Sequence, residues 1–257
     1  MDQLNLYESY PFEDEQKVYS QRGLDVVKSN VLVRQARFEL TATEQKIIVY
    51  LISKVKPKDD FFKHYEFRIV DFCDICGINK SNYKYITDVI KNLADKSFWL
   101  DFPDGSKRLC RWVSKAIIEP GEGIIQVRLD DDLQPYLLGL KKEFTKYALY
   151  NILAMNSAHS IRLYEILKSF ENMGYYRVRL EELRAALNIE GYKDFRDFRR
   201  DVLEKALKEI NETSDIKVQY EKLRKGRKID GLLFKIQSCT SREKSENHRN
   251  AIGRLDS

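Results

Sequence analysis

In the last third of the chain, five apolar residues recur at the spacing of an α-helix. These positions are Phe195, Phe198, Val202, Ala206 and Ile210. Steps of three and four residues place them on one face of a helix, which we expect to run from about 194 to 211. Asp194 comes directly before the stripe and is a candidate N-cap, because its side chain can accept a hydrogen bond from the first helical turn.

Beyond this helix the apolar period changes to that of a β-strand. Ile216, Val218 and Tyr220 alternate with polar residues, and a second apolar run covers 229–236. Gly226 lies between the two runs and suits a turn that needs a positive φ. The pattern therefore predicts a hairpin directly after the helix.

The first half of the chain repeats this order of elements. Its pattern predicts helices at about 41–55, 70–76 and 81–96, and strands at 65–69, 98–102, 109–119 and 124–129. The second half has a predicted helix at 157–171, a strand at 176–180 and a short helix at 181–187 before the helix and hairpin above. Helix, strand, helix, helix and hairpin thus occur twice, which predicts an α+β fold of two tandem winged-helix domains.

The domain boundaries follow from where the periodic patterns begin and end. We expect a flexible N-terminal arm at 1–29, an N-terminal winged-helix domain at 30–143, a C-terminal winged-helix domain at 144–237 and a flexible tail at 238–257. The strands at 98–129 are expected to form one β-meander, whose apolar edges could serve for dimerisation.

Charge changes the interpretation of the C-terminal helix. Arg196 and Arg200 flank its apolar stripe, and Arg199 falls in line with the stripe, where full burial of the charge would be costly. If the first turns project beyond the domain, these arginines are free to contact DNA, as in a recognition helix. The alternative is a solvated cluster that pairs with Asp197, Asp201 and Glu204.

The hairpin favours the DNA interpretation. Its tip carries five cations within seven residues, which repel one another unless phosphates supply the opposite charge. These are Lys222, Arg224, Lys225, Arg227 and Lys228. The whole chain has 257 residues and a net charge of only +5, so a nucleic-acid surface must arise from such local clusters.

Other candidate chemistry is weak. Cys73 and Cys76 form a CxxC pair without the two further ligands that zinc needs. The acidic run 130–132 is better explained as a helix start than as a magnesium site. His159 and the tyrosines 147 and 150 lack the partners of a catalytic site. We therefore expect no catalytic residue, no metal and no cofactor, and no phosphate-binding glycine loop is present.

The N-terminus lacks the features of a secretory signal, and no apolar run is long enough to cross a bilayer. The four cysteines of an unexported chain are expected to be reduced, which predicts a cytoplasmic protein.

The second half resembles the iteron-binding plasmid replication initiator (Rep) family. The matching segments are 144–147, 160–168, 180–187, 195–203, 208–211 and the basic hairpin at 222–228. The residues 30–33 and the helix at 40–51 look like the family's first winged helix, so the resemblance covers roughly 30–237. It implies two pseudo-symmetric winged-helix domains that bind repeated duplex sites at a plasmid origin. It also implies origin opening, recruitment of the host replication initiator and replicative helicase, and repression of the protein's own gene by a homodimer formed through the N-terminal domain.

The resemblance assigns DNA contacts to both domains. In the C-terminal domain, Arg196, Arg199 and Arg200 would contact bases, while Lys193 and the five hairpin cations would contact phosphates. The corresponding N-terminal helix begins with Lys80, Ser81, Asn82, Tyr83 and Lys84, which would mainly anchor the DNA backbone. Two such helices would enter successive major grooves on one face of the DNA, ~34 Å apart.

Two alternative functions remain open from the sequence. A double winged-helix transcription regulator without replication activity would have the same two domains. A nicking enzyme is the weaker alternative, because such enzymes need a histidine–metal cluster. Tandem repeats beside an AT-rich stretch would favour initiation, whereas a lone palindrome in a metabolic operon would favour regulation.

Overall fold

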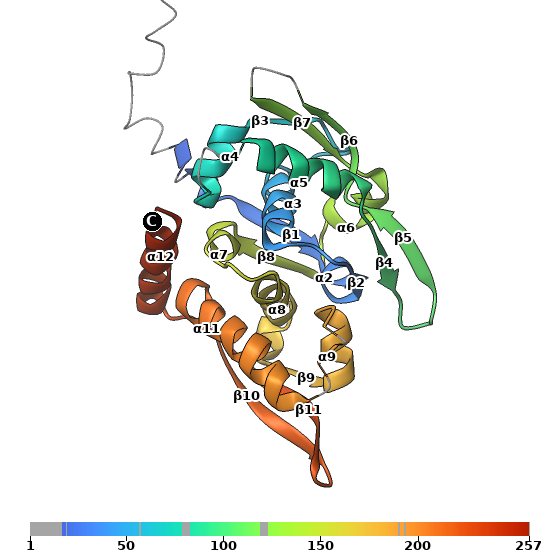
Figure 1. The fold of residues 1–257 in the computed structure, drawn as a ribbon, viewed down its shortest axis with the longest axis vertical. Coiled ribbons are helices and arrows are strands. Elements are labelled where there is room, and N and C mark those ends of the chain that lie inside the picture. The colour runs from blue at the N-terminus through green and yellow to red at the C-terminus, as the bar shows by residue number, and fades with distance from the viewer. Residues whose placement is uncertain are drawn as a thin grey trace, which may run out of the picture.

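The computed structural model describes residues 17–18, 20–56, 58–78, 83–118, 123–189, 191–192 and 194–256. The chain forms two α+β halves in sequence order, one above the other in Figure 1. Each half has the predicted order of helix, strand, helix, helix and hairpin.

The N-terminal half is built around α3, whose start is fixed by its sequence. Thr41 Oγ1 accepts from the N–H of Glu44 at 3.2 Å, and Glu44 Oε2 accepts from the N–H of Thr41 at 2.7 Å, which forms a capping box. The elements are β1 (Asp25–Ser29), α2 (Asn30–Gln35), β2 (Ala36–Arg37), α3 (Ala42–Ser53), β3 (Tyr65–Arg68), α4 (Ile69–Cys76), α5 (Tyr83–Asp95), β4 (Ser97–Asp101), β5 (Lys107–Arg111), β6 (Val113–Ile118), β7 (Ile124–Leu129), η2 (Asp131–Leu133) and α6 (Gln134–Leu137).

The prediction of one β-meander at 98–129 is wrong. The β4–β5 hairpin extends β2 in a sheet of order β2-β4-β5, whereas β6–β7 joins β3 in a separate sheet of order β3-β7-β6. The predicted strand at 109–119 is interrupted at Trp112, which is buried and stacks on Phe98 with ring centroids 4.2 Å apart. Burial of this large ring in the core divides the strand between the two sheets.

The C-terminal half repeats the arrangement with a longer hairpin. Its elements are β8 (Phe144–Ala148), α7 (Tyr150–Leu153), α8 (Ala158–Lys168), η3 (Glu171–Met173), β9 (Tyr175–Arg179), α9 (Leu180–Ala186), α10 (Phe195–Phe198), η4 (Arg199–Leu203), α11 (Glu204–Thr213), β10 (Ile216–Lys225), β11 (Lys228–Ser238) and α12 (Ser241–Leu255). The antiparallel sheet has the order β10-β11-β9. Gly231 has no room for a side chain, because a Cβ would lie 2.5 Å from the carbonyl oxygen of Val178 on β9.

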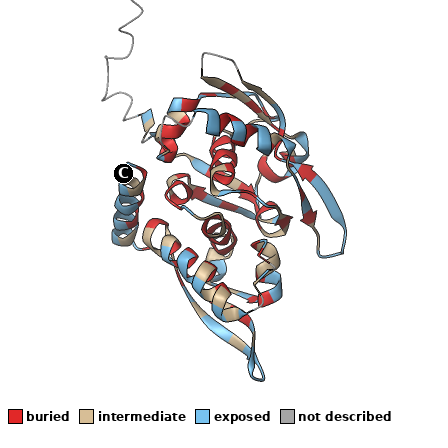
Figure 2. Cartoon of the chain, in the orientation of Figure 1, coloured by how far each residue is buried: buried red, intermediate tan, exposed pale blue. Residues whose placement is uncertain are grey.

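The two halves share one interface at the centre of the molecule. β1, the first strand of the N-terminal half, pairs with β8, the first strand of the C-terminal half, with Val27 opposite Lys146. Lys28 Nζ lies 2.5 Å from Glu165 Oε1 in this interface, and the same carboxylate accepts from the hydroxyl of Tyr147. Figure 2 shows buried residues concentrated along α3, α8 and β8. One continuous apolar core therefore includes residues of both halves.

The predicted N-terminal arm at 1–29 extends too far, because β1 lies within it. The arm was predicted to include residue 29, but Asp25–Ser29 is an ordered strand with Val26 fully buried. Its short, mixed pattern becomes a strand because β8 supplies a partner edge from far along the sequence.

The prediction of a flexible tail at 238–257 is also wrong. Ser241–Leu255 forms α12, which begins with a capping box between Thr240 and Glu243. Ala251 and Leu255 are buried, and the side-chain amide of Asn247 donates to the carbonyl oxygen of Ser214 at 2.6 Å. The helix is therefore held by α7 and α11 rather than by its own propensity, since its sequence is mostly polar.

Candidate nucleic-acid interface

The predicted C-terminal helix is continuous but contains one wide turn. α10 begins at Phe195 with Asp194 as the N-cap, whose Oδ1 accepts from the N–H of Arg196 at 2.8 Å. A π-helical turn follows at η4, and α11 completes the helix. Phe198, Val202, Ala206 and Ile210 are buried as their spacing predicts, and Phe195 is partly buried against the core. π-turns are rare and occur often at functional sites.

The three arginines of this helix occupy different environments. The side chains of Arg196 and Arg200 are exposed. Arg200 is held by carboxylates, with Nη2 at 2.7 Å from Asp201 Oδ2 and Nη1 at 3.2 Å from Asp197 Oδ1. The hydrogen bonds to Asp201 raise the pKa of Arg200, and the same guanidinium lowers the pKa of Asp201. Arg200 thus pairs with two of the acidic residues named in the solvated-cluster alternative.

Arg199 does not project freely from the domain. Its side chain is 38% exposed, and Nε lies 3.3 Å from Oε1 of Glu204. Burial raises the pKa of Tyr220 on β10, and the positive charge of Arg199 opposes this rise. The π-turn begins at Arg199, so the angular positions expected for a regular α-helix do not hold here.

The basic hairpin forms a wing beside this helix. Its strands pair from Ile216 opposite Ser238 to Lys225 opposite Lys228, and Gly226 at the turn has φ 62°. Lys222 Nζ lies 5.6 Å from the centre of the Phe195 ring, which connects the wing to the first turn of the helix. All five hairpin cations are exposed, and within the described residues none of them forms an ion pair. The wing therefore presents uncompensated positive charge.

The N-terminal domain has a corresponding but less basic helix. Ile86, Ile90 and Leu93 of α5 are buried as predicted, whereas Tyr83, Lys84 and Tyr85 are exposed in its first turn. The Tyr85 hydroxyl donates to Oγ1 of Thr43 at 3.0 Å. Four of the residues expected to contact DNA lie outside the described residues: Lys80, Ser81, Asn82 and Lys193.

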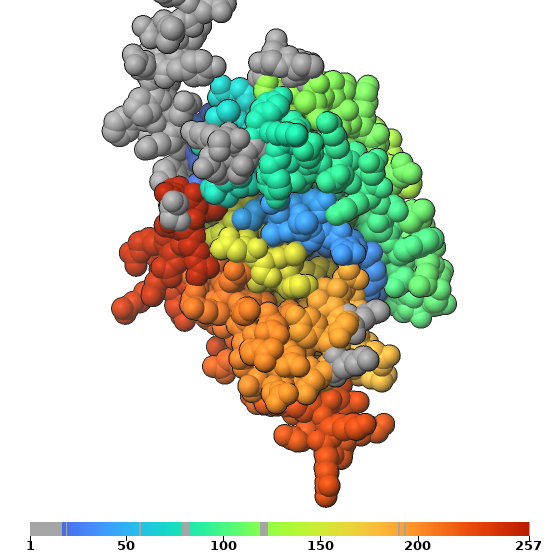
Figure 3. Space-filling model, viewed as in Figure 1, coloured from blue at the N-terminus to red at the C-terminus, as the bar shows by residue number. Residues whose placement is uncertain are grey.

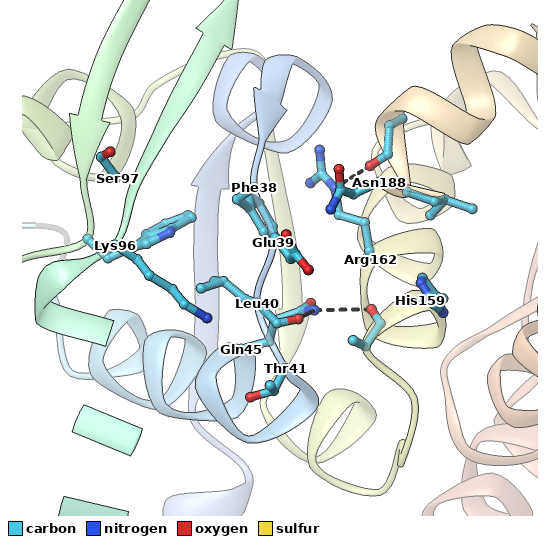
Figure 4. A pocket seen from close by; sticks show the side chains of 14 residues that line it. Phe38, Glu39, Leu40, Thr41, Gln45, Lys96, Ser97, His159, Arg162 and Asn188 are labelled. Carbon is cyan, nitrogen blue, oxygen red and sulfur yellow. Dashed lines mark hydrogen bonds between the residues drawn. The ribbon is translucent and has the colours of Figure 1, made fainter. Parts of the chain in front are cut away.

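Both helices are accessible on the same face of the molecule. Figure 3 shows the segments of α5 and of α10–α11 in front, with parts of α3 and of the segment around 153–160 between them. A cavity of about 600 Å³ also opens where the halves meet (Figure 4). The N-terminal half contributes Gln45 and Lys96 to its wall, and the C-terminal half contributes His159 and Arg162. Burial lowers the pKa of His159, which favours a neutral imidazole there.

The described residues provide little for metal or thiol chemistry. They contain no group of three or more metal-ligating side chains. All four cysteines are buried and free, and burial raises the pKa of the Cys76 thiol to about 12. Asp130 caps η2 by accepting from the N–H of Asp132 at 3.0 Å, as expected for a helix start. No helix in the described part of the chain has the length and apolar character needed to cross a membrane.

Comparison with known families gives two consecutive matches. Residues 25–168 match the family described as "Initiator Replication protein, WH1", and residues 179–236 match "Initiator Rep protein, WH2". Together the matches span both halves of the fold. The first match continues to residue 168, so the boundary near 143 stays a prediction.

Individual relatives agree with these matches. The "PI protein" of Escherichia coli is 31% identical over 149 residues, which are 50% of this chain and 47% of that protein. The aligned part thus spans about half the length of that relative. An "Uncharacterized 27.6 kDa protein" of Escherichia coli is 24% identical over 217 residues, or 77% of this chain and 90% of that protein. The "Crystal structure of Pi initiator protein in complex with iteron DNA" superposes with a TM-score of 0.72 at 21% identity, covering 86% of this chain and 99% of that one. The last comparison shows that the fold is shared.

Proposed function

The chain belongs to the initiator replication protein family, and we propose that it is a plasmid replication initiator that binds repeated duplex sites, or iterons, at its origin. One structural observation carries the proposal: two winged-helix domains in one chain present α5 and α10–α11 on a common face. This arrangement suits successive major grooves of a duplex. The solved relative whose fold this chain shares is described as a complex with iteron DNA.

In this proposal the C-terminal domain reads the base sequence. Arg196 and Arg200 are exposed near the start of the helix, where recognition helices contact base edges. Arg199 would reach DNA by exchanging Glu204 for a base or phosphate. The wing cations, with Lys193, would hold phosphates, and Tyr83 and Lys84 with residues 80–82 would anchor the N-terminal domain to the backbone. The protein would act by assembly and DNA distortion in the cytoplasm, without an active site.

The proposed partners are the duplex, the host replication initiator and the replicative helicase. A homodimer that represses the protein's own gene would form through the N-terminal domain. The β4–β5 hairpin is the proposed dimer surface. Its Trp99 and Leu109 lie directly opposite each other and are 47% and 48% exposed. β5 is also the edge strand of its sheet, and its outer side has no partner strand among the described residues.

A plasmid test separates initiation from simple regulation. A plasmid whose only origin is the cognate repeat region is introduced into a host that supplies this protein from another locus. The proposal predicts transformants that maintain the plasmid, and none when the protein is absent. If the purified protein binds the repeats but the plasmid is never maintained, the protein is a double winged-helix regulator instead.

A further inference from the structure

A second cavity lies where the end of α12 meets the two winged-helix domains. Its volume is about 220 Å³. It is enclosed by the first turns of α3, the end of α4, the segment after α7 and the last turn of α12. Lys46 of α3 lines this cavity although the residue is only 8% exposed. Desolvation of a charge is costly unless the charge is paired, so the groups around Lys46 decide whether this cavity suits an anion.

Among the described residues, no carboxylate forms an ion pair with Lys46. Among the described residues its ammonium group forms no hydrogen bond and no ion pair, and burial lowers its pKa. The neighbouring Cys76 cannot supply the charge, because burial raises the pKa of that thiol to about 12 and keeps it neutral. The charge of Glu209 opposes the lowering of the Lys46 pKa, but its carboxylate oxygens accept from the N–H groups of Asn156 and Ser157, at 3.2 and 3.4 Å. Arg254, on the same wall, pairs with Glu212 at 2.5 Å.

The pseudo-symmetry of the fold indicates what Lys46 lacks. Thr41 and Ser157 are the N-caps of α3 and α8, and Lys46 and Arg162 each follow their cap by five residues. Lys46 lines a cavity between α3 and the end of α4, and Arg162 lines a cavity between α8 and the end of α9.

The two cations differ in what they bind. Arg162 Nη2 donates to the carbonyl oxygen of Ala36 at 2.7 Å, and its Nε donates to that of Ala186 at 3.2 Å. Arg162 thus joins the two domains, whereas its counterpart Lys46 is left with an open cavity. A cation without an ion pair among the described residues makes this cavity a candidate anion site.

The surroundings favour a phosphate oxygen. Thr43, in the first turn of α3, lines the cavity and accepts from the exposed Tyr85 at the start of α5. The first turn of a 12-residue helix adds partial positive charge from its backbone N–H groups. The walls are also largely polar, with Asn156 and Arg254 among them. Through the hydrogen bond from Tyr85 to Thr43, the cavity wall contacts the start of α5, which is the N-terminal helix of the proposed DNA-binding face.

We infer that Lys46 and the first turn of α3 bind a phosphate group, supplied by the backbone of bound duplex where it crosses between the two recognition helices. This inference rests on the proposed function for the source of the phosphate. A backbone phosphate and free inorganic phosphate have the same recognition chemistry, so the two sources must be separated by experiment. The role of Lys46 is to neutralise one phosphate charge at a fixed position between the domains.

The test uses the full chain with Lys46→Met, Lys46→Arg and, as matched control, Lys58→Met, which removes an exposed lysine outside the cavity. Duplex binding is measured by fluorescence anisotropy over a series of salt concentrations. Lys46→Met should weaken binding about tenfold and reduce the salt slope by about one. Lys46→Arg should retain most of the affinity, which shows that loss in the methionine variant reflects charge rather than misfolding. Lys58→Met should leave the affinity within about twofold of wild type, as expected for a lysine that contacts no phosphate.

A second arm omits DNA and compares thermal unfolding in inorganic phosphate and in chloride at equal ionic strength. The site is assigned to free phosphate if two results are found together. Phosphate raises the melting temperature of wild type but not of Lys46→Met, and the two proteins bind the duplex with the same affinity. If neither duplex affinity nor phosphate stabilisation depends on Lys46, the inference is overturned while the proposed function stands. If wild type itself does not bind the repeats, the proposed function fails, and the phosphate arm alone decides the site.

Discussion

Arg22 Nη1 lies 2.8 Å from Asp256 Oδ1, so an ion pair joins segments near the two ends of the described chain. Arg22 is buried, and its other nitrogens donate to the carbonyl oxygens of Ile75 and Asp74 at 2.9 and 2.8 Å. One guanidinium thus connects the N-terminal segment, the end of α4 and the end of α12. Both ends of the described chain therefore contribute to the contact between the domains.

Replacing this guanidinium should destabilise the protein. In Arg22→Met, two carbonyl oxygens and one carboxylate lose their donor, and we expect the free energy of unfolding to fall by about 1–3 kcal/mol. Urea denaturation followed by circular dichroism measures the change. Arg249→Met, which removes an exposed arginine of α12, is the control and should change stability by less than about 0.5 kcal/mol. Equal effects of the two substitutions would contradict the role given to Arg22.

The two basic elements of the C-terminal domain should differ in how they affect specificity. Arg200→Ala should weaken binding to the cognate repeat by roughly tenfold more than binding to random duplex, because a bidentate base contact discriminates between sequences. Lys225→Ala at the wing tip should weaken both alike and lower the salt slope by about one. Anisotropy titrations on the two duplexes measure both ratios. Equal losses on both duplexes for both variants would mean that the helix does not read bases.

The order of elements could be predicted from the sequence because apolar spacing reports local structure directly. The helices around Ile86 and Phe198 and the wing with its turn at Gly226 all depend on residues close together in the chain. The repeat of the same order in both halves then indicates two winged-helix domains. The positions of the exposed arginines Arg196 and Arg200 follow from the same helical periodicity.

The errors arise where distant residues decide the structure. Trp112 divides a predicted strand because it stacks on Phe98, and nothing in the local pattern signals that contact. The sequence pattern likewise gives no signal for the π-turn that begins at Arg199, because a few apolar positions fit both α-helical and π-helical spacing. For α12 a signal was available: Thr240 and Glu243 have the spacing of a capping box, although the polar helix that follows resembles a disordered tail.

The cavity beside Lys46 could not be predicted from the sequence. Lys46 comes directly before the apolar residues of α3, and only the folded structure places the end of α4 and the end of α12 around it. Its equivalence to Arg162 likewise needs the boundaries of both helices.

The cysteines should be unreactive in the folded protein. The thiolate is the reactive form, and burial raises the pKa values of Cys76, Cys110 and Cys239. Reaction with a thiol reagent at pH 8 should therefore be slow until the protein is unfolded, when all four cysteines react. Rapid reaction of native protein, followed by absorbance, would contradict the burial of these thiols.

The same shift predicts a decline in stability at high pH. An ordinary cysteine has a pKa of 9.0, whereas Cys76 in the folded protein has a pKa of about 12. Between these values the unfolded chain releases a proton that the folded chain retains, so the free energy of unfolding should fall as the pH rises. Cys76→Ser should make this part of the decline smaller in urea titrations at several pH values.

The β4–β5 surface predicts the self-association behaviour. Replacing Trp99 with serine removes an exposed aromatic ring directly opposite Leu109 and should shift a dimer towards monomer in sedimentation velocity. Phe61→Ser, which changes an exposed aromatic residue outside this hairpin, serves as the comparison and should leave the dimer intact. If wild type and Trp99→Ser sediment alike as dimers, the proposed dimer surface is wrong.

A hydroxyl-radical footprint of the purified protein on a duplex that carries a single repeat shows whether both winged-helix domains contact the same repeat. Two winged-helix domains with recognition helices on a common face should protect two segments on one side of the duplex, about ten base pairs apart. Arg200→Ala should weaken protection of the segment that the C-terminal domain covers before it affects the other. Protection of a single segment, or none on the repeat beyond that on random duplex, would contradict the account.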